Sequence, residues 1–213
     1  MLAGRYKIHG NIRFLSHQET MRVIARAIIR SGIEPAYSQG YNPHLKLSLP
    51  LPRNVGLASD DELFCAGIEA SRRQQTEKFS FADSIAEQLP EGLELVSVEI
   101  IEKPVAYQPV EVEYLVKVNL LEKREKIEKI NEQIRAGSEI LIERTVNREG
   151  DVKTIDVGKF LKSFEIVQQG VRVFCRVLPT GTIRPDEILR LLNMDSYEVS
   201  SSIVRKKVIW QIN

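Results

Sequence analysis

The chain has 213 residues, of which 43% are hydrophobic and 28% are charged, and its formal net charge is +1. This composition indicates a folded protein long enough for two domains of about 100 residues each, and it excludes both a disordered chain and a polycation that binds any anionic surface. The charge is uneven, because residues 1–60 hold eight basic and three acidic residues. An acidic or phosphate-rich partner would therefore meet the N-terminal part first.

The cysteines and the N-terminus indicate a cytoplasmic protein. Cys65 and Cys175 lie far apart in apolar stretches, which favours buried free thiols in a reducing compartment over a disulfide. The N-terminus becomes charged at Arg5, before the apolar segment of a signal peptide can form. No apolar run approaches the roughly 20 residues that span a bilayer, so no membrane association is expected.

The first half of the chain predicts six elements, beginning with an alternating strand and a capped helix. Tyr6 and Ile8 alternate with charged residues, which indicates a strand with one buried face. Ser16 and Glu19 match a capping box, and Gly32 is a stop signal for the helix that follows. The predicted strands cover residues 5–14, 44–51, 62–68 and 93–101, and the predicted helices cover residues 16–32 and 81–89. The order β-α-β-β-α-β is that of a ferredoxin-like unit.

Within this half, a polar loop runs directly into a strictly alternating strand. The apolar face of the strand comprises Leu45, Leu47, Leu49 and Leu51, and its polar face comprises His44, Lys46 and Ser48. In the loop, Gly40 is free to adopt positive φ and Pro43 fixes a turn. Around them lie the hydrogen-bonding side chains of Tyr37, Ser38, Tyr41, Asn42 and His44. A plain connector does not need this chemistry, so the loop is a candidate binding site.

The second half predicts the same order of elements after a proline-containing linker at residues 104–110. Strands are predicted at residues 112–120, 140–146, 171–178 and 199–212, and helices are predicted at residues 122–136 and from Pro185 onward. A less regular insertion, with a turn at residues 147–151, separates the two middle strands. We therefore expect an α+β protein with two tandem ferredoxin-like (βαββαβ) domains, residues 1–103 and 111–213.

Residues 13–56 carry short motifs that resemble a known family. The motifs are Arg13-Phe14-Leu15-Ser16-His17, Ala36-Tyr37-Ser38-Gln39-Gly40-Tyr41-Asn42-Pro43-His44, Lys46-Leu47-Ser48 and Pro50-Leu51-Pro52, with Arg22 and Arg26 on the intervening helix and Gly56 at the end. They resemble the signature of the radical SAM-linked family, a bacterial domain encoded beside, or fused to, the C-terminal end of a cobalamin-type radical SAM protein. A looser resemblance extends through Arg184-Pro185 and Ile188-Leu189.

The resemblance implies an accessory protein that acts with a radical SAM enzyme, and it implies no established reaction. Members of the family often lie in gene neighbourhoods with an RNase of the E/G type and ribosomal proteins. Membership therefore implies a role in RNA- or ribosome-related modification. A radical SAM protein is the expected partner and RNA is a further candidate, whereas nothing in the sequence indicates DNA.

The residues of the chain itself do not predict a metal or a cofactor. A radical SAM enzyme binds a four-iron cluster through three closely spaced cysteines, and two distant cysteines cannot do so. His9, His17 and His44 lack the spacing of zinc ligands. No glycine-rich loop has the pattern of a phosphate-binding or dinucleotide-binding motif.

A basic face of the first domain is the second candidate surface. In a ferredoxin-like sheet the helices cover one face and leave the other open. Arg5, Lys7 and His9 of the first strand could share this open face with His44, Lys46 and Ser48, and cationic groups there could hold phosphates. The alternative is an open face that only packs against the second domain. The candidate binding residues are Arg5, Lys7, Arg13, His17, Tyr37, Ser38, Gly40, Tyr41, Asn42, His44, Lys46 and Ser48.

Three functions are compatible with the sequence. The leading hypothesis is a non-catalytic binding module that uses the polar loop and the basic face to engage a radical SAM partner, its RNA substrate, or both. The first alternative is a metal-free RNA endonuclease resembling CRISPR repeat-processing enzymes, which cleave by general acid/base catalysis. Its candidate catalytic residues are His17, Tyr41, His44 and Lys46. The second alternative is a purely structural protein-interaction domain.

Overall fold

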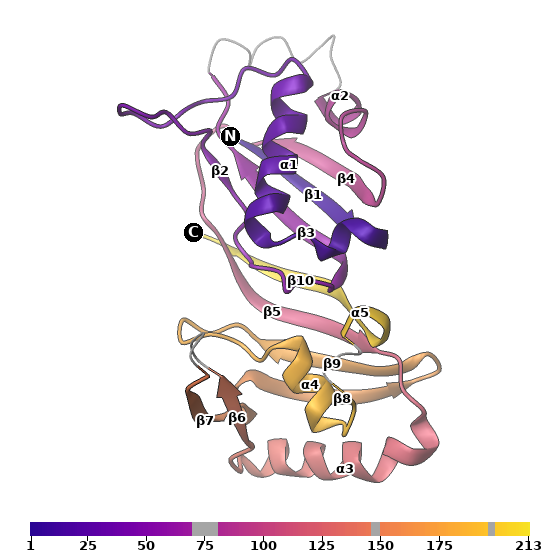
Figure 1. The fold of residues 1–213 in the computed structure, drawn as a ribbon. Coiled ribbons are helices and arrows are strands. Elements are labelled where there is room, and N and C mark those ends of the chain that lie inside the picture. Colours follow the sequence, from indigo (N-terminus) through magenta and orange to yellow (C-terminus); the bar gives the residue numbers. More distant parts are fainter. Residues whose placement is uncertain (70–80, 146–149, 196–198) are drawn as a thin grey trace. The chain divides into compact units, whose positions relative to one another are not determined.

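The computed structural model describes residues 1–69, 81–145, 150–195 and 199–213, which form two compact units (Figure 1). Unit 1 comprises Met1–Pro109 and Trp210–Asn213, and unit 2 comprises Val110–Ile209. The boundary between the units falls inside two strands, β5 (Tyr107–Val116) and β10 (Ile203–Ile212). Mixed strands and helices confirm the predicted α+β class.

Unit 1 contains an antiparallel sheet in the order β4-β1-β3, with β2 also paired to β3. Its elements are β1 (Leu2–Ile8), the 3-10 helix η1 (Gly10–Phe14), α1 (His17–Arg30), β2 (Leu47–Ser48), β3 (Ala58–Ala66), α2 (Phe81–Ala86) and β4 (Leu93–Ile100). Apart from the short η1, this is the order of strands and helices predicted from the sequence.

Helix α1 begins and ends at the predicted signals. The Ser16 hydroxyl accepts a hydrogen bond from the Glu19 amide at 3.3 Å, and the Ser16 amide donates to the Glu19 carboxylate at 2.8 Å. These bonds satisfy two of the backbone groups that a helix start leaves without intrahelical partners, and they lower the pKa of Glu19. At the other end, Gly32 has a φ of 77°, a left-handed conformation that favours glycine.

The core of unit 1 lies between the sheet and its helices. Leu2, Tyr6 and Ile8 of β1 point to this side and pack in one cluster with Ile24 and Ile28 of α1. Because side chains alternate along a strand, the residues between them on β1 point to the opposite face of the sheet. That opposite face carries the residues expected to form the basic surface.

Three predicted elements of unit 1 are shorter than expected. The strand at residues 5–14 stops at Ile8, because the chain enters η1 at Gly10 with a φ of 59°. The strand at residues 44–51 is reduced to β2, and the residues before it form a hairpin-like loop instead. The helix at residues 81–89 ends at Ala86, and its last residues form a turn ahead of Pro90.

Unit 2 contains a sheet in the order β10-β5-β9-β8 and a separate two-stranded sheet of β6 and β7. Its other elements are α3 (Leu120–Ala136), β6 (Leu141–Thr145), β7 (Val152–Asp156), the 3-10 helix η3 (Gly158–Phe160), β8 (Leu161–Val167), β9 (Gly170–Arg176), α4 (Pro185–Leu191) and α5 (Val199–Ser202). Two strands, β7 and β8, occupy the segment expected to be an irregular insertion. Most of the predicted turn at residues 147–151 lies outside the described residues.

Residues 104–110 are only partly a linker. The boundary after Pro109 falls inside this segment, but residues 107–110 belong to β5. The C-terminal end also differs from the expected division, because residues 210–213 belong to unit 1. There the rings of Trp210 and Tyr107 pack in a T-shaped arrangement, with centroids 6.5 Å apart. Within the described ranges, no helix is both long and apolar enough to cross a membrane.

Candidate functional site

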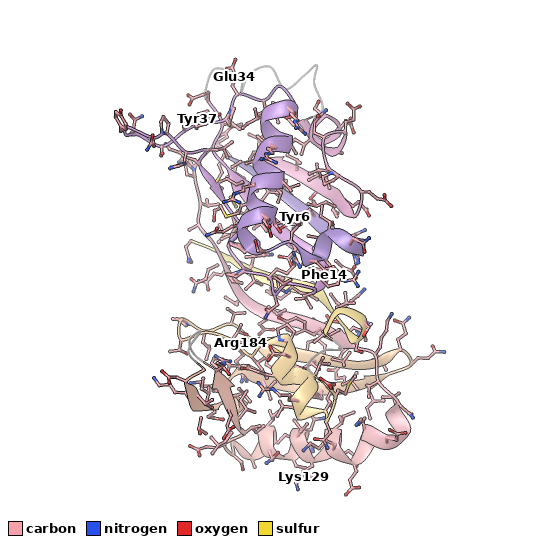
Figure 2. The ribbon with its side chains drawn as sticks, in the orientation of Figure 1. Tyr6, Phe14, Glu34, Tyr37, Lys129 and Arg184 are labelled. Carbon is pink, nitrogen blue, oxygen red and sulfur yellow. The ribbon has the colours of Figure 1, made fainter. Side chains whose placement is uncertain are left out.

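The polar loop is a projecting arm, defined here as residues 35–47. Figure 1 shows it as the purple loop that extends from unit 1 near β2, and Figure 2 labels Tyr37 on it. Tyr37 and Leu45 form an antiparallel bridge, and the Ser38 amide donates to the His44 carbonyl at 2.8 Å. The Ser38 hydroxyl also accepts a hydrogen bond from the His44 amide at 2.9 Å. The two sides of the arm are therefore tied together up to its tip.

A closed ring of three backbone hydrogen bonds fixes the foot of the arm. The Ala36 amide donates to the Gly67 carbonyl at 2.9 Å, the Gly67 amide to the Lys46 carbonyl at 2.7 Å, and the Lys46 amide to the Ala36 carbonyl at 2.9 Å. A Cβ on Gly67 would lie 3.1 Å from the Cβ atoms of both Ala36 and Lys46. Glycine at this position therefore lets three chain segments meet.

The tip of the arm, residues 39–43, is presented to solvent. Gly40 has a φ of 132°, a value that side-chain-bearing residues rarely adopt. Tyr41 is 100% exposed, and Gln39, Asn42 and His44 are exposed as well. In the described part of the chain, no side-chain hydrogen bond connects Gln39, Tyr41 or Asn42 to the rest of the protein. The arm thus combines a fixed foot with a free tip.

A pocket of about 660 Å³ lies at the foot of the arm, within unit 1. Its walls come from the ring residues Ala36, Lys46 and Gly67, from β2, from the end of β3 and from residues 104–107. Most of this lining consists of apolar side chains, namely those of leucine, isoleucine, valine, proline and alanine. The volume is within the range of about 300–1,000 Å³ that is typical of small-molecule sites.

The polar groups of the pocket are few. Ser48 pairs with Cys65 across β2 and β3, which places their side chains on the same face of the sheet. Burial raises the pKa of the Cys65 thiol to about 11, and burial is also the main reason why the pKa of Tyr107 is raised. Both groups are therefore neutral near pH 7. Of the described residues that line the pocket, only Lys46 has a charged side chain.

Residues 2–196 match the family described as "Uncharacterized protein conserved in bacteria (DUF2344)". The chain belongs to the DUF2344 family. A search of curated proteins found no match. The match of this DUF2344 protein includes the whole arm and every pocket residue except Met1, so the site is part of the family's own domain. The link to radical SAM proteins depends on the resemblance of the motifs alone and stays a prediction.

Two cations of the predicted basic face of the DUF2344 protein, Arg5 and Lys7, are paired with acidic residues. Arg5 points to the same side of the sheet as Ser48, since Arg5 pairs with Leu63 and Ser48 with Cys65, two residues further along β3. However, Arg5 forms an ion pair with Asp61 at 2.7 Å. Lys7 pairs with Glu94 at 3.1 Å, and His9 lies 2.9 Å from Asp60. These neighbouring carboxylates compete with any phosphate for the β1 cations.

Arg13 and His17 lie at a distance from the arm. His17 is the first residue of α1, whereas the arm follows the last, Arg30. A helix of 14 residues is about 21 Å long. Figure 2 accordingly shows Phe14 and Tyr37 at opposite ends of the helix. Arg13 donates to the Gly10 carbonyl at 2.6 Å and stacks on Phe14, with its guanidinium carbon 4.7 Å from the ring centroid.

The four candidate catalytic residues are consequently not brought together. His17 is a helix length away from Tyr41, which is at the arm tip, and from His44 and Lys46, which are on the returning side of the arm. A general acid and base must both reach the reacting atoms within hydrogen-bond distance. In addition, within the described residues no three histidine, cysteine or acidic side chains gather in a way that could hold a metal ion.

Sequence reasoning missed the pocket and one arginine that organises the corner before α1. Arg53 is only 7% exposed and donates from Nη1 to the carbonyls of Arg13, Asn54 and Leu57 and from Nη2 to that of Leu15. No local pattern marks an arginine as buried. The pocket was missed because its walls come from five separate stretches of sequence. The alternation that places Lys46 and Ser48 on one face was the only available signal.

Proposed function

We propose that the protein is a non-catalytic binding module that docks to a radical SAM enzyme through the tip of the arm. The observation that carries this proposal is the contrast between a foot fixed by a hydrogen-bond ring and a tip whose Tyr41 is completely exposed. An exposed tyrosine offers a large apolar surface and a hydroxyl group, and such residues dominate the binding energy of many protein interfaces.

The fixed foot favours docking for a second reason. Binding costs free energy whenever a mobile segment has to be ordered, and a segment held in its bound shape avoids much of this cost. The bridge between Tyr37 and Leu45 and the two bonds between Ser38 and His44 hold the arm in one shape below its tip. Tyr41, Asn42 and His44 are therefore presented together.

The identity of the partner follows from the motif resemblance. The arm tip carries Gln39-Gly40-Tyr41-Asn42-Pro43, the centre of the motif shared with the radical SAM-linked family. That family is encoded beside radical SAM proteins, and this chain has no cysteine set for an iron-sulfur cluster of its own. An RNA- or ribosome-related substrate would then belong to the partner enzyme.

The proposal includes a fold of two ferredoxin-like units. The strand orders that support it are β4-β1-β3-β2 in unit 1 and β10-β5-β9-β8 in unit 2. In this interpretation, β6 and β7 form an inserted hairpin between α3 and β8. In each unit the first and third strands are antiparallel neighbours, as expected for the split βαβ arrangement.

The geometry favours binding over metal-free RNA cleavage. The acid/base set proposed for the endonuclease is divided between the two ends of α1, and the cations of β1 are paired with carboxylates. A purely structural interaction domain differs from the proposed module in one testable respect, because it does not need the arm tip to hold its partner.

Affinity capture with a matched control tests the proposal. The tagged chain and its Tyr41→Ala/His44→Ala variant are expressed in the native bacterium, and captured proteins and RNA are identified by mass spectrometry and RNA sequencing. We expect a radical SAM protein with the unaltered chain and with Val55→Ala, an exposed site outside the arm, but at least a tenfold loss with the arm variant. Capture of RNA without a radical SAM protein, or equal capture by the arm variant, would contradict the proposal.

A further inference from the structure

The pocket at the foot of the arm is a separate feature from the exposed tip. Its volume of about 660 Å³ exceeds what one inserted side chain needs, and all of its lining residues belong to unit 1. Three of them, Ala36, Lys46 and Gly67, form the backbone ring, so this wall is as firmly held as the arm itself. A preformed cavity of this kind binds small molecules without a large ordering cost.

The lining specifies an apolar body for the ligand. Leu47, Pro50 and Ile68 line the pocket together with the aliphatic residues 104–106. Binding is favoured when apolar ligand surface is removed from water there. Burial at this wall also raises the pKa of the Cys65 thiol, as expected in an apolar environment.

The charge of the pocket specifies the polar end of the ligand. Lys46 is exposed, makes no ion pair within the described residues and is the pocket's one charged lining side chain there. The Lys46 Cβ lies only 3.1 Å from the position that a Cβ on Gly67, another lining residue, would occupy, so the Lys46 side chain starts from the pocket wall. Cys65 and Tyr107 are neutral near pH 7, and the described lining residues include no carboxylate. No anionic side chain among them therefore competes for the Lys46 ammonium group. An anion is therefore favoured at this point and a cation is disfavoured.

From these observations we propose that the pocket binds a small amphiphilic anion, with an apolar or aromatic body in the pocket and one carboxylate, sulfonate or phosphate group at Lys46. This ligand site goes beyond the proposed docking of the arm tip and does not depend on it. The occupant has the chemistry of a short fatty acid or an aromatic acid.

Two fluorescent probes that differ by one charge test the proposal on the full chain. 1-Anilinonaphthalene-8-sulfonate carries a sulfonate, whereas N-phenyl-1-naphthylamine has the same rings without it. We expect saturable one-site binding of the sulfonate probe and its displacement by decanoate. Lys46→Met should weaken the sulfonate probe about three- to fivefold and leave the uncharged probe unchanged. Arg22→Met, which removes an exposed charge from α1, should change neither.

A second pair of variants tests the cavity itself. Ala106→Phe adds bulk to the pocket wall and should abolish binding of both probes, whereas Val96→Phe adds bulk at an exposed position of β4 outside the pocket and should not. Unchanged melting temperatures show that the variants fold. Equal probe binding by all four variants, or binding that does not saturate at one site, would overturn the proposal. If the Lys46→Met variant still captures the radical SAM protein, docking through the arm tip is intact. A change in probe binding by this variant then reflects the pocket and not the arm.

Discussion

Gly67 is the residue on which the shape of the site most depends. It contributes both a donor and an acceptor to the hydrogen-bond ring, and the Cβ atoms of Ala36 and Lys46 leave no room for a third. We expect Gly67→Ala to destabilise the protein by about 1–2 kcal/mol, because the ring prevents its neighbours from moving apart. Gly4→Ala should cost more, since its Cβ would overlap the buried Phe64 ring. Urea unfolding of both variants shows whether Gly4→Ala is the more destabilising change. A Gly67→Ala protein as stable as the original would contradict the expected loss of stability.

Cys65 provides a test of the apolar pocket that depends on pH. The thiolate is the reactive form, so a pKa of about 11 predicts alkylation by iodoacetamide that is slow at pH 8 and rises about tenfold per unit up to pH 11. In the unfolded chain the thiol should titrate near its ordinary value of about 8.5. The folded state therefore retains a proton that the unfolded state releases, so this group's contribution to stability is lost as the pH rises from about 9 towards 11.

Mass spectrometry of the alkylated peptides separates the two cysteines. Cys175 is completely buried, and burial raises its pKa even further, so it should stay unlabelled at every pH at which the protein is folded. If labelling of Cys65 already reached its plateau near pH 8, the thiol would lie in polar surroundings. That result would contradict an apolar pocket.

At the scale of elements, a buried ion pair joins β6 to α4 in unit 2. Glu187 is 0% exposed and accepts from Arg144 Nε at 2.6 Å, from Arg144 Nη2 at 2.7 Å and from the Arg184 amide at 2.8 Å. The hydrogen bond to Glu187 is also the main reason why the pKa of Arg144 is raised. The two-stranded sheet is thus attached to the helix by a charged contact.

Removing one partner of this pair leaves the other without its counter-charge. We expect Glu187→Ala to lower the free energy of unfolding by about 3 kcal/mol, and Glu187→Ala combined with Arg144→Met to lower it by less than the sum of the single changes. Chemical denaturation of the three variants measures this coupling. Additive effects would mean that the two side chains do not stabilise unit 2 as a pair.

The elements also show what sequence patterns can and cannot predict. The capping residues of α1 act within four positions of the chain, so its start was found correctly. Strand β7 has exposed side chains at Val152, Lys153 and Thr154, and without a buried face it lacks the apolar alternation that identifies a strand. Residues 44–46 do alternate, but they pair within the arm and with its neighbours instead of extending β2.

For the whole molecule, contacts between distant segments limited the sequence predictions. The ion pairs of Arg5 with Asp61 and of Lys7 with Glu94 join residues from different strands, so the pairing of these two cations could not be recognised from the alternation of β1. The final residues likewise return to unit 1, where Asn213 and Ala106 exchange backbone hydrogen bonds of 3.0 and 3.2 Å. A pattern along one strand reveals which face a residue occupies but not what lies opposite it.

The proposed contact between the arm tip and a radical SAM protein can be tested on the whole molecule. Photocrosslinking in cells tests it most directly, with p-benzoylphenylalanine in place of Tyr41 and, as a control, in place of the exposed Val96 on β4. We predict a crosslink to a radical SAM protein from position 41 and none from position 96. Crosslinks to unrelated proteins only, or the same product from both positions, would contradict the claim.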